Sequence, residues 1–283
     1  MQKRIDDIEF EHVPAGRRLI KRCIVEPMVN YVLPADFLRW LLRVTKSELA
    51  QANWQDPGGW LSMVISYDGR PKQWADKLLV NGGSLSMALR NRKRLASEVL
   101  ADLIDRSTSS PAEVLCVGAG PGLVIMDALE RLKREDVRAT LVDLSDDAHD
   151  YARRVAAQRG LDKFLHFVSG DIRTMNLAGL LTNKLDVVKM IGICEYLEDD
   201  RLVEISRVIW SAMPPGGSVV LNSLSYAHGT ARFLRKVFGL HMIHRTPEQL
   251  EALMTRAGFG DFSRWSEPLD VYHVIVARRK ESC

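Results

Sequence analysis

Three alternating glycines follow a short apolar run near the middle of the chain. Residues 114–117 read Val-Leu-Cys-Val, and Gly118, Gly120 and Gly122 come directly after them, before a helix-forming stretch. Glycine lets a backbone turn tightly around a ligand and adopt positive φ where a side chain would be strained. A strand, a glycine loop and a helix in this order predict a nucleotide-cofactor site.

Two aspartates follow the next two predicted strands. Asp143 lies in the apolar run 138–144, and Asp171 follows the run 164–169. A carboxylate at the first position could accept both hydroxyls of a ribose, and one at the second lies where an adenine amino group would be met. Each aspartate alone could equally begin a helix as its N-cap. Their order after the glycine loop favours cofactor contacts.

A dinucleotide-binding loop would carry glycine at the sixth position of its motif, where this chain has Leu123, so NAD is disfavoured. The glycine loop, the acidic end of the second strand and the acidic turn after the third resemble the class I S-adenosylmethionine-dependent methyltransferases. Further stretches that resemble this family follow in order: 185–192, 193–200, 213–222, 246–250, 257–259 and 271–277. The resemblance therefore covers residues from about 110 to the end. One departure is Cys116, because the family commonly has an acidic residue there.

This resemblance implies a doubly wound, Rossmann-like α/β fold with a seven-stranded, mostly parallel sheet, and S-adenosylmethionine as the cofactor. The residues expected to bind the cofactor are Gly118, Ala119, Gly120, Gly122, Asp143, Leu144, Asp171, Ile172, Ile191 and Gly192.

The first part of the chain shows helix-like apolar spacing instead of strands. The spacing in 34–51 and 85–104 predicts that residues 1–109 form a helical cap or lid on a cofactor-binding domain of residues 110–283. Glycine pairs in 56–60 and 81–84 predict turns or hinges. Trp54 and Trp60 are expected to contact the substrate, although either could instead pack in the cap's own core. The basic run 90–94 is expected to be a solvated helix face, although it could instead meet an anionic substrate or a carrier protein.

Within the family, the closest resemblance is to small-molecule methyltransferases with an acidic-Tyr-Leu element after the fourth strand. Here that element is Glu195-Tyr196-Leu197, and Asn222 ends the fifth strand. The Tyr196 ring could face a sulfonium, a cation–π contact of roughly 0.5–2 kcal/mol, or pack beneath the next helix. Glu195 could take a proton from the acceptor, although a place at the start of that helix, where its charge suits the helix dipole, is the favoured interpretation. Asn222 is expected to bind substrate or to make a structural bond.

Two further catalytic candidates come from the loops near the end of the chain. Tyr226 follows the fifth strand, and His244 precedes the last predicted helix. Either side chain could take a proton from a hydroxyl or amine acceptor. His244 could also bind an acidic group, or lie in a solvated turn.

The amino-acid composition limits the kinds of partner that we expect for this chain. The 283 residues include 39 basic and 36 acidic ones, a net charge of +3, which argues against a nucleic-acid partner. No run approaches eighteen apolar residues and the N-terminus lacks the apolar core of a secretion signal, so we expect a cytoplasmic protein without membrane contact. The four cysteines have no metal-type spacing, so no metal is expected. A homodimer is one candidate assembly.

The predicted activity is methyl transfer to a small metabolite, such as a carboxylate intermediate in natural-product biosynthesis. A carboxylate acceptor needs no proton removed. The alternative on the same scaffold is attack by the cofactor's own amine on its γ-carbon, which releases methylthioadenosine and azetidine-2-carboxylate. A binding module without turnover is disfavoured, because it would not need the glycines and both aspartates together.

Overall fold

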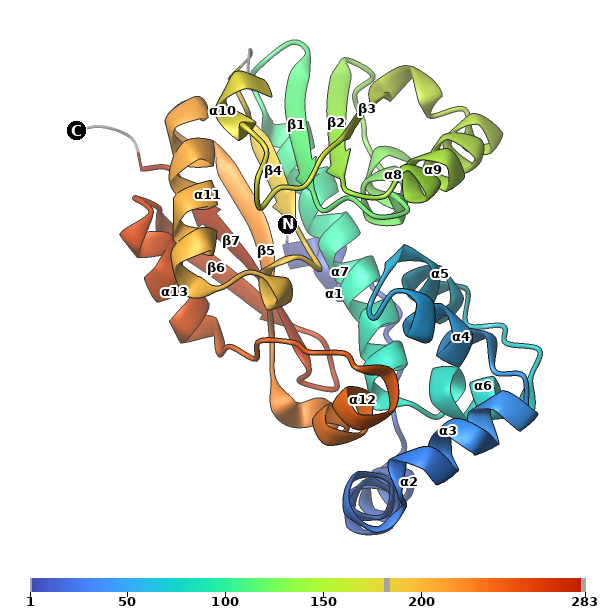
Figure 1. Ribbon diagram of the computed structural model, residues 1–283. Helices are drawn as coiled ribbons and strands as arrows, with labels where there is room; N and C mark the ends of the chain where they lie inside the picture. The colour runs from blue at the N-terminus through green and yellow to red at the C-terminus, as the bar shows by residue number, and fades with distance from the viewer. Residues whose placement is uncertain (1, 181–183, 281–283) are drawn as a thin grey trace.

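A seven-stranded sheet forms the centre of the computed structural model, which describes residues 2–180 and 184–280 (Figure 1). Its strand order is β3-β2-β1-β4-β5-β7-β6. The strands are β1 (Ala112–Val117), β2 (Val137–Asp143), β3 (Leu165–Ser169), β4 (Val187–Met190), β5 (Ser218–Leu224), β6 (Gly260–Ser266) and β7 (Tyr272–Arg278). Strands β1 to β5 are parallel, and β7 is antiparallel to both of its neighbours. The predicted seven-stranded, mostly parallel sheet is confirmed.

Helices cover both faces of the sheet, because successive residues of its strands point to opposite sides. In β1, Val114 and Cys116 pack on one side, while Leu115 and Val117 pack on the other. The first side is covered by α7 (Ser84–Arg106), α8 (Leu123–Leu129) and α9 (Asp146–Arg159), and the second by α10 (Leu177–Leu180), α11 (Asp199–Ala212) and α13 (Pro247–Arg256). Every residue of β4 and β5 is buried, as expected for parallel strands covered on both faces.

The strand order reverses between β1 and β4. The chain leaves β1 toward one side of the sheet and enters β4 from the other, so their loops diverge at the carboxyl edge. The glycine loop follows β1, and Asp143 ends β2 beside it. This reversal positions the candidate site.

The N-terminal part is helical, as predicted. Its helices are α1 (Gln2–Asp6), α2 (Ala15–Ile20), η1 (Lys21–Val25), η2 (Met28–Val32), α3 (Ala35–Val44), α4 (Glu48–Gln55), α5 (Trp60–Asp68), α6 (Trp74–Asp76) and η3 (Lys77–Asn81), where η1 to η3 have π-helical hydrogen bonds. Three short 3₁₀ turns lie later in the chain: η4 (Asp162–Phe164), η5 (Cys194–Tyr196) and η6 (Tyr226–His228).

A helix from the second half of the chain joins the N-terminal helices. α12 (Ala231–Phe238) packs on α3 and α4, and its Phe233, Leu234 and Val237 share a core with Leu38 and Leu42. In contrast, α7 packs on the sheet along much of its length, through Ala88 and Leu89 against the ends of β5 and β7 and through residues 95–104 against β1. The division at residue 109 stays a prediction, and the packing places the change from cap to sheet earlier, near the start of α7.

We expect Leu100→Ala to destabilise the fold by about 2–5 kcal/mol, because Leu100 is fully buried between α7 and the sheet. The matched control is Leu78→Ala, in an exposed leucine of η3, with an expected change within about 0.5 kcal/mol. Urea unfolding followed by tryptophan fluorescence measures both. Equal losses in the two variants would contradict the packing of α7.

Candidate active site

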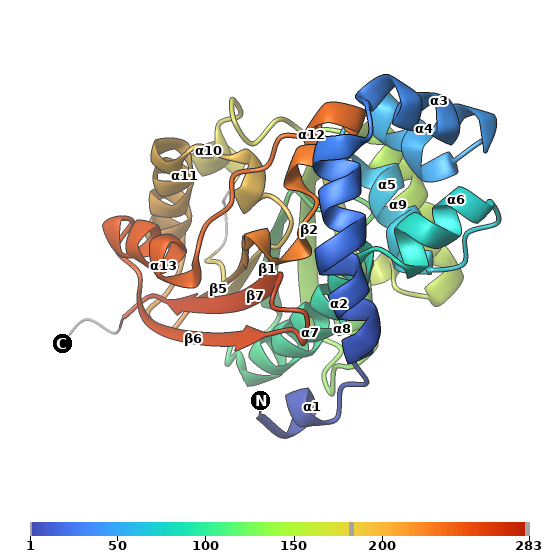
Figure 2. The same cartoon turned by 90° about the horizontal axis from the view of Figure 1, so that it is seen from below.

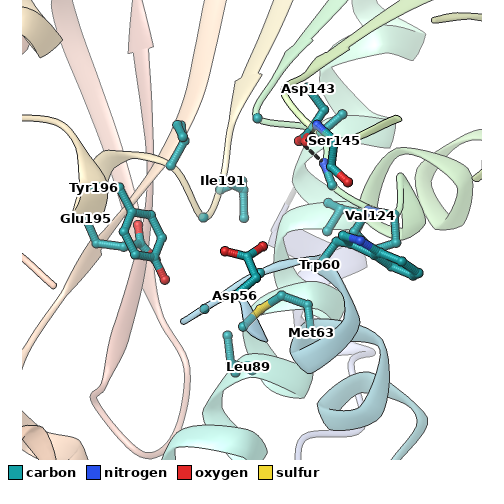
Figure 3. Close-up of a pocket in the computed structure, with 18 of the residues that line it drawn as sticks. Asp56, Trp60, Met63, Leu89, Val124, Asp143, Ser145, Ile191, Glu195 and Tyr196 are labelled. Carbon is teal, nitrogen blue, oxygen red and sulfur yellow. Dashed lines mark hydrogen bonds between the residues drawn. The ribbon is translucent and has the colours of Figure 1, made fainter. Parts of the chain in front are cut away.

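A cavity of about 340 Å³ lies at the carboxyl edge of the sheet, beneath the N-terminal helices (Figure 3). One wall is formed by the glycine loop and the ends of β2 and β4. The opposite wall comes from the loop 56–59 and from α5 and α7. Its volume lies within the usual range for small-molecule sites, roughly 300–1,000 Å³.

The glycine loop needs glycine for two different reasons. Gly118, Gly120 and Gly122 all have positive φ, between 54° and 68°. A Cβ on Gly118 would lie 3.0 Å from Cβ of Ile193, so that position is closed by packing. A Cβ on Gly120 would meet nothing within 4 Å, and Gly120 lines the cavity, so the loop is open to a ligand there.

The Asp143 carboxylate fixes this loop. Its Oδ2 accepts a hydrogen bond from Gly120 N at 2.6 Å, and its Oδ1 accepts one from Ser145 N at 3.0 Å (Figure 3). Asp143 also lines the cavity. A carboxylate oxygen accepts more than one hydrogen bond, so Asp143 retains the capacity to accept ribose hydroxyls.

Asp171 lies in a neighbouring cavity of about 150 Å³. The two cavities share lining residues, among them Gly118 and Tyr196, so together they form one elongated site. Arg173 pairs with Asp171 at 2.8 Å, and this hydrogen bond holds the pKa of Asp171 below its ordinary value. A polar ligand group at Asp171 would share the carboxylate with Arg173.

The structure brings nine of the ten predicted cofactor residues to these cavities. The main cavity contains Gly118, Ala119, Gly120, Asp143, Leu144, Ile191 and Gly192, and the smaller one adds Asp171 and Ile172. Gly122 is not among their lining residues. A Cβ there would lie 3.1 Å from both Leu141 and Met126, so it serves the packing of α8 on β2.

A buried lysine lies beside the position where the family commonly has an acidic residue. Lys189 in β4 pairs with Cys116 in β1 and donates a hydrogen bond from Nζ to Gly118 O at 3.1 Å. Burial lowers the pKa of Lys189 and raises that of the Cys116 thiol to about 11. Lys189 lines the cavity and was missed from the sequence, although a lysine within the apolar run 187–191 was the signal.

The basic run 90–94 is not a solvated face, because Arg90 and Arg92 are both buried. Arg92 lines the cavity, reaches Glu195 at 3.3 Å and the Tyr67 hydroxyl at 3.1 Å, and lies over the Tyr272 ring. The prediction of a solvated face was wrong because α7 is covered on both sides, by the sheet and by α5.

The Arg92–Glu195 pair is incompletely bonded. Among the described residues, Arg92 Nε and Glu195 Oε2 have no hydrogen-bond partner although both atoms are buried. An unpaired buried polar atom costs about 1–3 kcal/mol, and more when it is charged. For Glu195 the sequence favoured a place at the start of the helix after β4 over a catalytic role; it lies in η5 and lines the cavity.

Asn222 makes a structural bond. Its Oδ1 accepts from Gly192 N at 2.8 Å, which holds the turn after β4 against the end of β5. Asn222 is not among the residues that line the cavities. Of the two roles that the sequence left open, the contacts favour the structural one.

Tyr196 lines both cavities (Figure 3), and its hydroxyl lies against Gly58 of the loop 56–59. Gly58 has φ 76°, and a Cβ there would collide with the Tyr196 hydroxyl, so only glycine permits this close approach. Burial raises the pKa of Tyr196 well above its ordinary value, so the hydroxyl keeps its proton at neutral pH. Tyr196 can donate a hydrogen bond or face a cation, but it is a poor base.

Asp56, which the sequence suggested only as part of a turn, directs its carboxylate into the cavity (Figure 3). Within residues 2–180 and 184–280 its side chain has neither an ion pair nor a hydrogen bond. It is therefore the carboxylate of this site most available to a ligand.

The two predicted substrate tryptophans are separated. Trp60 lines the cavity, and its ring lies 5.4 Å from that of Tyr151. Trp54 instead donates a hydrogen bond to Val237 O at 2.9 Å and packs on Phe238, in the core shared with α12. Trp54 is therefore not among the residues that line the cavities.

The structure does not bring Tyr226 and His244 to the cavities. Tyr226 is 70% exposed and stacks on His244 with ring centroids 3.9 Å apart. His228 Nδ1 accepts from Thr230 N, so its Nε2 donates to His244 Nε2 at 2.9 Å. His244 Nδ1 in turn donates to Met242 O. Both imidazoles are neutral in this chain of bonds.

A family model and several solved structures resemble this chain. Residues 114–217 match the family model described as "Methyltransferase domain". A search of curated proteins finds no match.

Solved structures share the fold at low sequence identity. A possible exported protein from Bordetella parapertussis is 17% identical, covers 88% of this chain and 98% of its own, and has a TM-score of 0.59. The pyocyanin biosynthetic protein PhzM is 17% identical over 88% of this chain and 74% of its own, with a TM-score of 0.52. Human N-acetylserotonin methyltransferase, solved with S-adenosylmethionine, is 15% identical over 90% and 69%, with a TM-score of 0.50.

The resemblance inferred from the sequence is thereby confirmed for residues 114–217, which match a methyltransferase domain. The domain match and the residues of the site support S-adenosylmethionine as the cofactor. The open glycine loop, the Asp143 carboxylate and the elongated cavity fit such a molecule.

The described residues, 2–180 and 184–280, were compared with the requirements of a membrane span and of a metal site only through their own helices and side chains. None of the helices there is long and apolar enough to cross a membrane. No cluster of three or more histidine, cysteine or acidic side chains suited to a metal occurs in the same part of the chain.

We expect Asp143→Asn to weaken S-adenosylmethionine binding about tenfold to a hundredfold. The amide loses the charge that strengthens the bonds to Gly120 and to a ribose, and a hydrogen bond to a charged group contributes about 1.5–3 kcal/mol. Calorimetric titration measures the affinity. Asp150→Asn, in an exposed aspartate of α9, is the matched control, and an unchanged affinity in Asp143→Asn would refute the ribose assignment.

Stability should fall in acid because of His228. Burial, with smaller contributions from His244 and Lys21, lowers the pKa of His228 from 6.5 to about 3. Below pH 6.5 the unfolded chain therefore binds the proton that the folded chain excludes, and the lost stability is about 2 kcal/mol at pH 5. Urea unfolding at pH 7 and pH 5 should show a smaller loss in His228→Gln than in the wild type. The exposed His241→Gln should keep the full loss.

Proposed function

We propose that this protein transfers the methyl group of S-adenosylmethionine to a small acceptor held between the glycine loop and the N-terminal helices. The observation that carries the proposal is one continuous site, which runs from Asp171 past the glycine loop to an apolar chamber beneath the helices. The cofactor supplies an activated methyl group on a good leaving group, so the protein mainly aligns the acceptor and excludes water.

In this proposal the nine lining residues named above hold the cofactor, and Gly122 shapes the loop. Asp143 accepts the ribose hydroxyls, and Asp171 and Ile172 bound the adenine end. Lys189 and the Asn222–Gly192 bond fix the backbone around the loop and the turn after β4. Tyr196 faces the sulfonium, where a ring contributes roughly 0.5–2 kcal/mol.

The acceptor chamber is mostly apolar and has charge on two sides. Met63, Leu85, Leu89 and Met242 supply apolar surface, which favours a separate acceptor over a reaction of the cofactor alone. Buried Arg92, together with Lys189, favours a carboxylate acceptor, which needs no base. The Asp56 carboxylate on the opposite wall would instead favour an amine acceptor. A substitution of Asp56 therefore distinguishes a carboxylate acceptor from an amine acceptor.

This assignment places the protein among enzymes that modify small metabolites. PhzM is named as a biosynthetic protein, which supports natural-product biosynthesis as the setting. A cytoplasmic location and the absence of nucleic-acid and membrane partners remain predictions.

The test supplies S-adenosylmethionine alone and then with three acceptors that share a phenyl body: 3-phenylpropionate, 2-phenylethanol and 2-phenylethylamine. Mass spectrometry follows the products. We expect an unchanged cofactor without acceptor, and S-adenosylhomocysteine with a methyl ester from the carboxylate. Methylthioadenosine and azetidine-2-carboxylate without any acceptor would instead establish the cyclising alternative. Failure of all three acceptors would contradict the proposed chamber.

Substitution of Asp56 separates the acceptor classes. With a carboxylate acceptor, Asp56→Asn should leave the rate unchanged or raise it, because a like charge is removed. With an amine acceptor the rate should fall about tenfold or more, because the group that holds the amine and takes its proton is lost. The affinity for S-adenosylmethionine, measured by calorimetry, should stay the same in either case.

The ring of Tyr196 should matter more than its hydroxyl. Tyr196→Phe keeps the ring and should retain most of the rate, whereas Tyr196→Ala should lose about twofold to thirtyfold. Single-turnover rates at saturating cofactor measure the effect. Equal rates in the alanine and phenylalanine variants would show that Tyr196 only packs.

A further inference from the structure

A buried lysine of the central strand lies at the wall of the main cavity. β4 is the middle strand of the sheet, and α7 and α11 cover its two faces (Figure 2). Alternate residues of a strand point to the same side, so Lys189 points toward α7, as Val187 does. Lys189 is only 3% exposed, and it lines the cavity.

The ammonium group of Lys189 has unused bonding capacity. It carries three N–H donors. Within residues 2–180 and 184–280, Nζ donates one hydrogen bond, to Gly118 O at 3.1 Å, and forms no ion pair with a carboxylate. A buried charge is normally both paired and hydrogen-bonded. Lys189 can therefore bind an anionic group of a ligand in the cavity.

A second buried cation lies close to Lys189. Arg92 of α7 lines the same cavity, and among the described residues its Nε has no hydrogen-bond partner. Burial lowers the pKa of Lys189, and the charge of Arg92 lowers it further. Of the nearby carboxylates, Asp143 is bonded to Gly120 and Ser145, and Glu195 reaches only Arg92. An anion at Lys189 would offset the repulsion between the two cations.

The order of the strands indicates which part of the cofactor reaches Lys189. Four strands lie side by side in the order β3-β2-β1-β4 (Figure 1). In the proposed function the adenine lies at Asp171 after β3, and the ribose lies at Asp143 at the end of β2. The glycine loop after β1 comes next, and β4 with Lys189 follows it. A molecule that begins at Asp171 and passes the loop therefore brings its far end toward Lys189.

The far end of S-adenosylmethionine is an amino acid. It carries one ammonium and one carboxylate, and the sulfonium beside it is also positive. Lys189 and Arg92 repel both cationic groups. The carboxylate, in contrast, would accept a charge-assisted hydrogen bond from Nζ, which is about twice as strong as a neutral one.

We propose that Lys189 binds the carboxylate of S-adenosylmethionine and thereby recognises the amino-acid end of the cofactor. This inference rests on the proposed function, from which it takes the positions of the adenine and the ribose. With Lys189 engaged in this way, Arg92 is the cation that remains for a carboxylate acceptor.

Calorimetric titration of the full chain with three ligands tests the proposal. The ligands are S-adenosylmethionine, its decarboxylated analogue, and methylthioadenosine, which lacks the whole amino-acid end. The wild type should bind S-adenosylmethionine about tenfold to a hundredfold more tightly than the decarboxylated analogue. Lys189→Met keeps the length of the side chain without its charge and should reduce this preference to about threefold or less, with an unchanged affinity for methylthioadenosine.

A second variant separates the charge of Lys189 from its support of the glycine loop. In Lys189→Gln the amide can still donate to Gly118 O but carries no charge, so this variant should also lose the preference. Lys163→Met is the matched control. It removes an exposed lysine that lines neither cavity and should keep the full preference.

Three results would overturn the role of Lys189. One is a wild type that binds S-adenosylmethionine and the decarboxylated analogue equally, and another is a Lys189→Met variant that keeps the preference. The third is an equal loss of affinity for all three ligands in Lys189→Met, because Lys189 would then only support the loop.

The products with the phenyl acceptors distinguish this inference from the proposed function. Methyl transfer by a wild type without the preference would overturn the role of Lys189 alone. The preference without a methylated product from any acceptor would support the role of Lys189 and overturn the proposed methyl transfer alone.

Discussion

The hydrogen bond from Gly120 N–H to the Asp143 carboxylate is the contact on which the site depends. It joins the loop after β1 to the end of β2, and both lie beside the point where the strand order reverses. The loop reaches this position only because Gly118, Gly120 and Gly122 adopt positive φ, and the sheet keeps the two ends in register. With this contact in place, the loop stays open toward the cavity at Gly120, and the neighbouring turn at Gly192 is held from the other side by Asn222.

The parts of the fold that the sequence predicted are those that depend on local spacing. The apolar runs became β1 to β5, and Asp143 and Asp171 lie at the carboxyl edge, because parallel strands bring their ends together whatever the loops do. What could not be predicted depends on contacts between distant segments. Arg92 is buried because α5 and the sheet enclose α7, and Trp54 leaves the site because α12 offers Val237 O to its indole N–H. No local pattern specifies either contact.

The charged residues of the site also differ in whether local spacing or contacts between distant segments determine their position. A lysine in an apolar strand is visible in the sequence, but only the register of β1 and β4 places Lys189 beside Cys116 and under the glycine loop. Glu195 was expected to serve a helix, and it pairs with Arg92 because the turn after β4 enters the space between the sheet and α7. The result is a buried pair with unused bonding capacity at the wall of the cavity, opposite the Asp56 carboxylate.

The N-terminal helices and the cavity are linked through α12. Asn30 accepts a hydrogen bond from Phe233 N and from Lys236 of α12, and the segment after α12 carries Leu240 and Met242 into the cavity lining. Gly58, on the opposite wall, approaches Tyr196 and Leu240 so closely that a side chain there would collide with both. Both walls of the acceptor chamber are therefore held by contacts between segments that lie far apart in the sequence, and a substitution in α12 could change the shape of the chamber without touching a ligand.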